Sequence, residues 1–285
     1  MNGNQVAEAP GVPGNHGSAV SRRSFFKNAA LFGAATAVTA GALAPAASAI
    51  VRPSEETPQS NTLAAGDLDI LIAAEIAEAL AVTTYHHIIE MAPFFKRIPD
   101  DDQGYIRAAL QEEMSHYLLE QSVTNQNTPY DEFFYPKGMF EDTQTTLNTL
   151  VTLEDAFIAA YLVGVRNFST TALRLTAARI MGIESDHRTL ARVIGPDVAK
   201  RDGGPINFIT GAQGVSESVA PPNNNGYERT LCWTAISQAV DALTPFVDME
   251  AAESAGFNIE RKYKFHPFTP KLPNPLGDFF SYSGC

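Results

Sequence analysis

One chemical pattern occurs twice in this chain, and it limits the possible folds more than any other feature. In each half, a glutamate is followed seven residues later by a tyrosine and further on by a Glu-x-x-His sequence. The residues are Glu78, Tyr85, Glu113 and His116 in the first half, and Glu154, Tyr161, Glu184 and His187 in the second. On a helix, residues three apart share a face and seven residues make about two turns. The pattern therefore predicts four helical segments that direct four carboxylates and two imidazoles toward one place.

This combination of side chains is the ligand set of two-metal carboxylate sites in four-helix bundles. The predicted ligands of two transition-metal ions are Glu78, Glu113, His116, Glu154, Glu184 and His187. A single Glu-x-x-His would be weak evidence. Of the six histidines, however, only His116 and His187 have a glutamate three positions earlier. Carboxylates with one imidazole per ion suit both iron and manganese, so the ligand types do not decide between these metals.

Glu75 competes with Glu78 for the place in the first helix, because it lies less than one turn away near the same face. We prefer Glu78, since its spacing to Tyr85 repeats that of Glu154 to Tyr161. Both tyrosines are in phase to donate hydrogen bonds or electrons beside the metal ligands, although helix packing alone also explains them.

Glu112 competes with Glu113, because its helical phase is only about 40° from that of His116. Only Glu113 repeats the spacing of the second Glu-x-x-His, so replacement of Glu112 is expected to leave metal binding intact. Asp186 is about 160° from Glu184 in helical phase. We therefore expect it at the surface.

Apolar residues recur with a helical period in four segments, at about 67–91, 102–122, 145–167 and 169–194. Asp67 is the expected cap of the first helix, and Pro93 and Gly195-Pro196 are expected stops. The segment 125–143 is rich in Pro, Asn, Phe and Tyr and has no helical period. It is long enough to cross from one end of a bundle to the other. The sequence predicts an all-α protein, a four-helix bundle over 67–195 with one long crossover.

Residues 196–285 are predicted to form an extension that packs on the bundle. Within it, Arg229 to Thr244 reads as a fifth helix ended by Pro245, followed by a proline-rich tail that wraps over the bundle. Cys232 and Cys285 lack the spacing of a zinc or iron–sulfur site. They could pair in an oxidising compartment, and the sequence leaves this disulfide open.

Residues 1–49 have the features of a twin-arginine signal peptide. Arg22 and Arg23 precede an alanine-rich run, and Ala47-Ser48-Ala49 supplies a small-x-small cleavage sequence. We expect export by the twin-arginine machinery to the periplasm or the extracellular space, with residues 50–66 as a linker. An uncleaved amino-terminal anchor is the alternative. No later segment has about 18 consecutive apolar residues, so the mature chain is expected to be soluble.

The charge of the chain argues against nucleic acid as a partner. Removal of residues 1–49 leaves 17 basic and 31 acidic residues, a net charge of about −14. Phosphate binding needs clustered Lys and Arg, which this balance does not favour.

The helices and their ligand pattern resemble the ferritin-like bundles of bacterioferritins and rubrerythrins. More narrowly, the sequences 154–161 and 183–187 resemble exported ferritin-like proteins grouped with plant desiccation-related proteins. The resemblance covers residues 67–195. It implies the six metal ligands named above, with Glu113 and Glu184 placed to bridge or chelate, and it allows a homo-oligomer.

The function expected from ligand type is a di-iron or di-manganese oxidoreductase (an oxidase, peroxidase or catalase-like enzyme) that acts on O2 or H2O2 during oxidative or desiccation stress. Tyr85 and Tyr161 would assist beside the metal. The alternative is a stress-protective protein that holds metal for storage or for structure, without turnover. The extension at 196–285 disfavours a closed storage cage, whose subunits lack long irregular tails.

Overall fold

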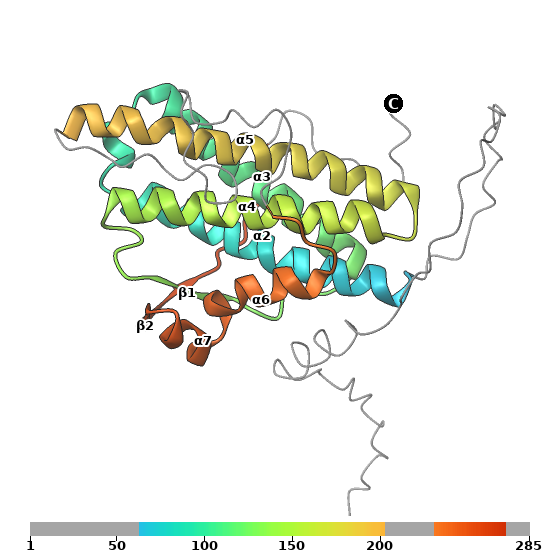
Figure 1. Cartoon of the computed structure of the whole chain (residues 1–285). Coiled ribbons are helices and arrows are strands. Elements are labelled where there is room, and N and C mark those ends of the chain that lie inside the picture. The colour runs from blue at the N-terminus through green and yellow to red at the C-terminus, as the bar shows by residue number, and fades with distance from the viewer. Residues whose placement is uncertain (1–62, 203–230, 272–285) are drawn as a thin grey trace, which may run out of the picture.

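Four long helices form a bundle in the computed structural model, which describes residues 63–202 and 231–271 (Figure 1). They are α2 (Ala65–Met91), α3 (Asp100–Thr124), α4 (Thr143–Asn167) and α5 (Thr171–Asp202). Helix α2 packs along α3 and α4 packs along α5, and the two pairs meet through contacts of α2 with α4 and of α3 with α5. The predicted all-α four-helix bundle is confirmed, and α2, α3 and α4 lie within a few residues of their expected ranges. The prediction that Gly195-Pro196 ends the fourth helix is wrong, because α5 continues through both residues to Asp202.

Local sequence signals explain where several helices begin and end. Pro93 follows the end of α2, and three consecutive acids, at 100–102, occupy the first turn of α3 near its positive dipole end. Helix α3 ends at Asn125, whose φ of 54° is left-handed. The carboxylate of Asp142 accepts a hydrogen bond from the Thr145 backbone N–H at 2.8 Å, which satisfies a free donor at the start of α4.

The prediction that Asp67 caps the first helix is wrong, because the helix begins two residues earlier at Ala65. Asp67 lies buried in the first turn instead. Its carboxylate accepts hydrogen bonds from the backbone N–H of Ser169, at 2.8 Å, and from the Ser169 hydroxyl. Ser169 lies between α4 and α5, so Asp67 joins the two helix pairs at one end of the bundle.

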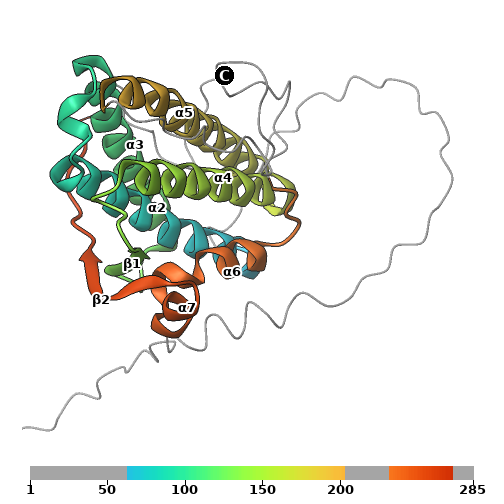
Figure 2. The ribbon, with the colours of Figure 1, turned by 60° about the vertical axis from the view of Figure 1, so that its left-hand side comes forward.

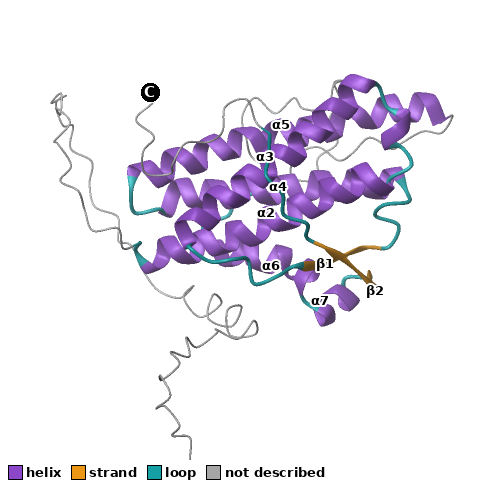
Figure 3. Ribbon diagram, turned by 180° about the vertical axis from the view of Figure 1, so that it is seen from behind, coloured by secondary structure: helices purple, strands orange, loops and turns teal. Residues whose placement is uncertain are grey.

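The sequence suggested an irregular crossover between α3 and α4, but the crossover contains a short strand. It contains β1 (Glu132–Pro136), which pairs antiparallel with β2 (Phe257–Lys264) from the extension. This two-stranded ladder lies beside α7 (Met249–Ser254) at one side of the bundle (Figure 3). The ladder therefore attaches the crossover to the carboxyl-terminal part of the chain.

The predicted fifth helix is present as α6 (Ile236–Val247), although its bounds differ from the expectation. Residues 231–235 are not helical, and Pro245 lies inside the helix instead of ending it. The buried face of α6 contacts α2 and α4, on the side of the bundle away from α3 and α5 (Figure 2). This face consists of Ala239, Val240, Leu243 and Phe246.

Among the described helices, only α4 is long and apolar enough to cross a membrane, with a mean hydropathy of 1.3. Within that window 72% of the residues are buried inside the protein, as in the core helix of a soluble bundle. The predicted signal peptide at 1–49, most of the predicted linker at 50–66 and Cys285 lie outside the described residues. Export and the Cys232–Cys285 disulfide therefore stay predictions.

Two helical glycines differ in their surroundings, which predicts opposite effects of replacement by alanine. A Cβ at Gly164 would lie 2.8 Å from the Phe168 ring and 3.3 Å from Ala177 Cβ, where α4 meets α5. A Cβ at Gly182 would meet nothing within 4 Å. Gly164→Ala should lower the free energy of unfolding by about 1–3 kcal/mol through overpacking. Gly182→Ala should raise it by about 0.5–1 kcal/mol through helix propensity.

Urea unfolding followed by circular dichroism measures both changes, and each variant controls for the other. Equal shifts of the same sign would contradict the close packing assigned to Gly164.

Candidate metal centre

The six predicted ligand residues meet in the bundle core. Helix α2 contributes Glu78, α3 contributes Glu113 and His116, α4 contributes Glu154, and α5 contributes Glu184 and His187. All six are buried, with exposed fractions between 0 and 4%. Each of two groups offers four ligand atoms within 4.8 Å of one another. The first group is Glu78, Glu113, His116 and Glu184, and the second is Glu113, Glu154, Glu184 and His187.

Glu113 and Glu184 belong to both groups and direct one oxygen into each. Glu113 Oε2 is 3.4 Å from His116 Nδ1, whereas its Oε1 is 2.8 Å from His187 Nδ1. Glu184 Oε1 is 3.2 Å from His116 Nδ1, and its Oε2 is 3.4 Å from His187 Nδ1. Two carboxylates that each face two imidazoles have the arrangement of ligands that bridge a pair of ions.

Many polar atoms in this cluster have no hydrogen-bond partner among the described residues. They include both carboxylate oxygens of Glu113 and of Glu184, and the Nδ1 atoms of His116 and His187. One oxygen of Glu78 and one of Glu154 are also without a partner. Buried polar groups are normally hydrogen-bonded, because leaving one unsatisfied costs about 1–3 kcal/mol and more for a charge. Cations in the two groups would satisfy these atoms together, so the residues fit a metal pair.

The ionisation of the cluster reflects crowded negative charge. Burial, followed by repulsion from Glu113, raises the pKa of Glu78 and of Glu154 well above the usual range. Burial also acts on Glu113, but the neighbouring imidazoles hold its pKa below the usual range. Burial alone lowers the pKa of an imidazole, yet the facing carboxylates raise the pKa of His116 and His187. Positive charge is therefore favoured at the centre, and bound metal would displace protons.

The two tyrosines of the repeated pattern form hydrogen bonds that connect the two halves of the chain. Tyr85 donates a hydrogen bond to Glu154 Oε1 at 2.6 Å, and Tyr161 donates to Glu78 Oε1. Each phenol thus bonds to the glutamate of the other half and leaves that carboxylate's second oxygen free to face the centre. Burial is the largest cause that raises the pKa of both phenols, so they stay protonated and keep donating.

Glu112 contacts the cluster from outside. Its Oε2 lies 2.9 Å from His187 Nε2, so His187 is held on one nitrogen while Nδ1 faces Glu113. A carboxylate behind a metal-binding histidine orients the ring and strengthens the ligand. Glu112 is absent from both groups, which agrees with its second rank as a ligand, but it is no longer expected to be dispensable. Asp186 is exposed, as its helical phase predicted.

Glu75, the other competing carboxylate, is also absent from both groups. It is buried and accepts a hydrogen bond from the Thr124 hydroxyl at 2.8 Å. Near it lies Glu120, a buried glutamate that the sequence reasoning missed. Glu120 accepts a hydrogen bond from Tyr161 at 2.7 Å. It lies one turn after His116 on the same helix, and that spacing was the signal available for finding it.

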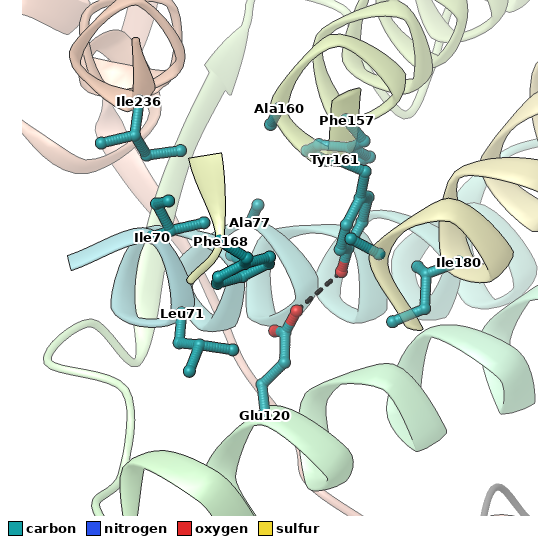
Figure 4. A pocket seen from close by; sticks show the side chains of 12 residues that line it. Ile70, Leu71, Ala77, Glu120, Phe157, Ala160, Tyr161, Phe168, Ile180 and Ile236 are labelled. Carbon is teal, nitrogen blue, oxygen red and sulfur yellow. Dashed lines mark hydrogen bonds between the residues drawn. The ribbon is translucent and has the colours of Figure 1, made fainter. Parts of the chain in front are cut away.

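An apolar pocket reaches the Tyr161 side of the centre. Figure 4 shows Tyr161 and Glu120 joined by their hydrogen bond at the wall of this pocket. The remaining lining is apolar and comes from α2, α4, α5, the α4–α5 connection and the start of α6. It includes Ile70, Leu71, Phe157, Phe168, Ile180 and Ile236.

Four helices thus surround a buried cluster of carboxylates and imidazoles that is compatible with bound metal. Residues 66–194 match the family model of the ferritin-like domain. This part of the chain, which spans α2 to most of α5 and contains all six clustered residues, is similar to the ferritin-like domain. Neither the curated proteins nor the solved structures gave a match. The narrower resemblance to desiccation-related proteins stays a prediction.

Glu75 predicts a pH-dependent loss of stability. Burial, partly offset by Thr124, raises its pKa from 4.5 to about 7. A raised folded-state pKa gives stability that is complete below the unfolded value and lost as the pH rises through the folded value. Glu75→Gln keeps an acceptor for Thr124 and removes the charge. At pH 8 the free energy of unfolding of the variant should therefore exceed that of the wild type by about 2 kcal/mol. At pH 4 the two proteins should differ little.

Urea unfolding of both proteins at the two pH values measures this difference. Glu141→Gln is the matched control for the loss of one carboxylate, because Glu141 is exposed. An equal effect of Glu75→Gln at both pH values would contradict a raised pKa.

Proposed function

We propose that the ferritin-like domain binds two iron or manganese ions and uses them in redox reactions with O2 or H2O2. One observation carries the metal pair: Glu113 and Glu184 each direct one oxygen into each of two ligand groups, and these oxygens have no other hydrogen-bond partner among the described residues. The ions would be held by Glu78, Glu113, His116, Glu154, Glu184 and His187.

The donor set supports the choice of metals. Four carboxylates offset the charge of two divalent ions, and anionic oxygen ligands with one imidazole per ion suit iron and manganese in more than one oxidation state. When bound, such a pair supplies two electrons to an oxygen or peroxide substrate.

The chain's own residues support a reaction at this place as well as binding. Tyr85 and Tyr161 each donate to a carboxylate that faces the centre, so both phenols hold these carboxylates in place at the edge of the site. The apolar pocket beside Tyr161 and Glu120 suits a small uncharged molecule (Figure 4). Its mainly apolar lining disfavours charged solutes.

The second candidate is a metal pair that stabilises the fold without turnover. The burial of all six ligand side chains favours this candidate, because it limits access from solvent. Ions held by all four helices would stabilise the bundle, since metal-binding free energy adds to folding free energy. The two candidates share the same ligands and differ only in their response to an oxidant.

The metal assignment predicts that the paired substitution Glu113→Gln and Glu184→Gln removes most bound metal. Glutamine keeps the shape of the side chain but loses the charge that holds a cation, so affinity should fall more than about 100-fold. Elemental analysis of the chain purified from its own host, with about two ions per chain expected, measures the loss. Circular dichroism should show that the helices persist.

Asp186→Asn is the matched control, because this acid lies on the same helix but is exposed. It should leave the metal content unchanged. Equal metal content in wild type and in the double variant would overturn the assignment.

The redox proposal predicts a fast spectral response to oxidant. Addition of H2O2 or O2 to reduced, metal-loaded protein should change the visible absorption at least about tenfold faster than with free metal at equal concentration. His116→Ala or His187→Ala should abolish the response, because each removes one group's only nitrogen ligand. Tyr85→Phe should keep the metal and alter only the rate.

Stopped-flow absorption measures these rates. Loaded protein that responds to neither oxidant would reject the redox function and leave the structural candidate.

A further inference from the structure

A second group of imidazoles lies outside the metal centre, where the carboxyl-terminal extension covers α2. His86, His87 and Glu90 occupy the last two turns of α2 and offer ligand atoms within 4.8 Å of one another. His266 follows β2 and brings a third ring, 5.1 Å from the His86 ring and 6.3 Å from the His87 ring between centroids. His86, His87 and Glu90 thus already have ligand atoms in mutual range, and the exposed His266 ring lies beside them although it is about 180 residues away in the chain.

His87 is the unexplained member of this group. Both of its ring nitrogens are buried, and apart from the Lys264 backbone, which favours the protonated ring, neither has a hydrogen-bond partner among the described residues. Rings of Phe140 and Tyr263 pack against it, with centroids at 5.6 Å and 5.0 Å. A purely apolar ring would fill this place without burying two polar atoms.

The protonation of His87 suits a metal ligand. Burial, followed by the nearby His86, lowers its pKa from 6.5 to about 4, against the opposing effects of Glu90 and the Lys264 backbone. At neutral pH the ring is therefore uncharged, and a cation need not displace a proton from it. His86 is close to Glu90, with Nε2 to Oε2 at 3.2 Å, so carboxylate and imidazole already lie together.

We propose that His86, His87, Glu90 and His266 form a separate site for one divalent cation that prefers imidazole, such as Zn²⁺ or Cu²⁺. Imidazole nitrogens suit these metals, whereas the carboxylate-rich core centre suits iron or manganese. The Glu90 side chain is 56% exposed and that of His86 is 25% exposed, so an ion reaches the group from solvent. The nearby Arg261 guanidinium lies over the Tyr263 ring and donates to Met91 Sδ, so it has partners of its own.

An ion at this site would connect two parts of the fold. His86, His87 and Glu90 belong to the bundle, whereas His266 belongs to the extension. The bound cation would therefore clamp the end of β2 onto α2, next to the β1–β2 ladder.

The first test counts zinc ions on the full chain. With Glu113→Gln and Glu184→Gln in place to weaken the core centre, equilibrium dialysis with Zn²⁺ should find one tightly bound ion per chain. Further substitution of His86→Gln with His266→Gln should lower this affinity at least about tenfold. Both side chains are partly or largely exposed, so the fold should persist, as circular dichroism can verify.

Glu90→Gln and Glu260→Gln form a matched pair. Both acids are exposed, Glu90 on α2 and Glu260 on β2, but only Glu90 belongs to the group. Glu90→Gln should weaken zinc binding, and Glu260→Gln should not. Equal binding by all of these variants would overturn the site.

The second test identifies the ligands with Cu²⁺. Electron paramagnetic resonance of the same full chain should show coupling of one copper ion to at least two imidazole nitrogens, whereas each core group offers only one. The coupling should fall in His266→Gln, and the rise in melting temperature on Zn²⁺ addition should fall with it. A spectrum with a single nitrogen that is unchanged in His266→Gln would reject the proposal, whatever the outcome for redox activity in the core.

Discussion

Burial of four carboxylates and two imidazoles at the centre of the bundle is the constraint on which the rest of the structure depends. Such a concentration of negative charge opposes folding unless protons or metal cations balance it. The chain holds the carboxylates in place with neutral donors, since Tyr85 and Tyr161 bond one oxygen each of Glu154 and Glu78. The second oxygen of each of these two carboxylates has no hydrogen-bond partner among the described residues and faces the place that a cation would fill.

The two halves repeat one pattern, yet their surroundings differ. Glu112 supports His187, but the equivalent position before Glu184 is Ile183, which cannot support His116 in this way. Tyr161 has the additional partner Glu120, and the equivalent position after His187 is Ala191. The two ligand groups therefore differ in charge and in hydrogen bonding, so ions bound there would differ in affinity and in potential.

The bundle and the convergence of six side chains followed from the sequence because both depend on helical periodicity, which is local. The spacing of Glu113 and His116 fixes their common face wherever the helix packs. The partner of Glu112 could not be found in this way, because it lies on another helix. Asp67 was misread for the same reason, since its carboxylate bonds Ser169 far along the chain. Pairing of β1 with β2 depends on segments that have no helical or alternating signal of their own.

The β1–β2 ladder also sets an order of events during synthesis. Its strands lie more than 120 residues apart, and loop closure over such a distance waits until both have been made. Helices α2 to α5 can associate while the ribosome is still producing the extension. The crossover, however, gains its partner strand only after residues 257–264 have emerged. A prematurely ended chain would thus keep its bundle helices but leave the backbone edge of β1 exposed to other chains, which makes completion of the carboxyl-terminal segment a safeguard against aggregation.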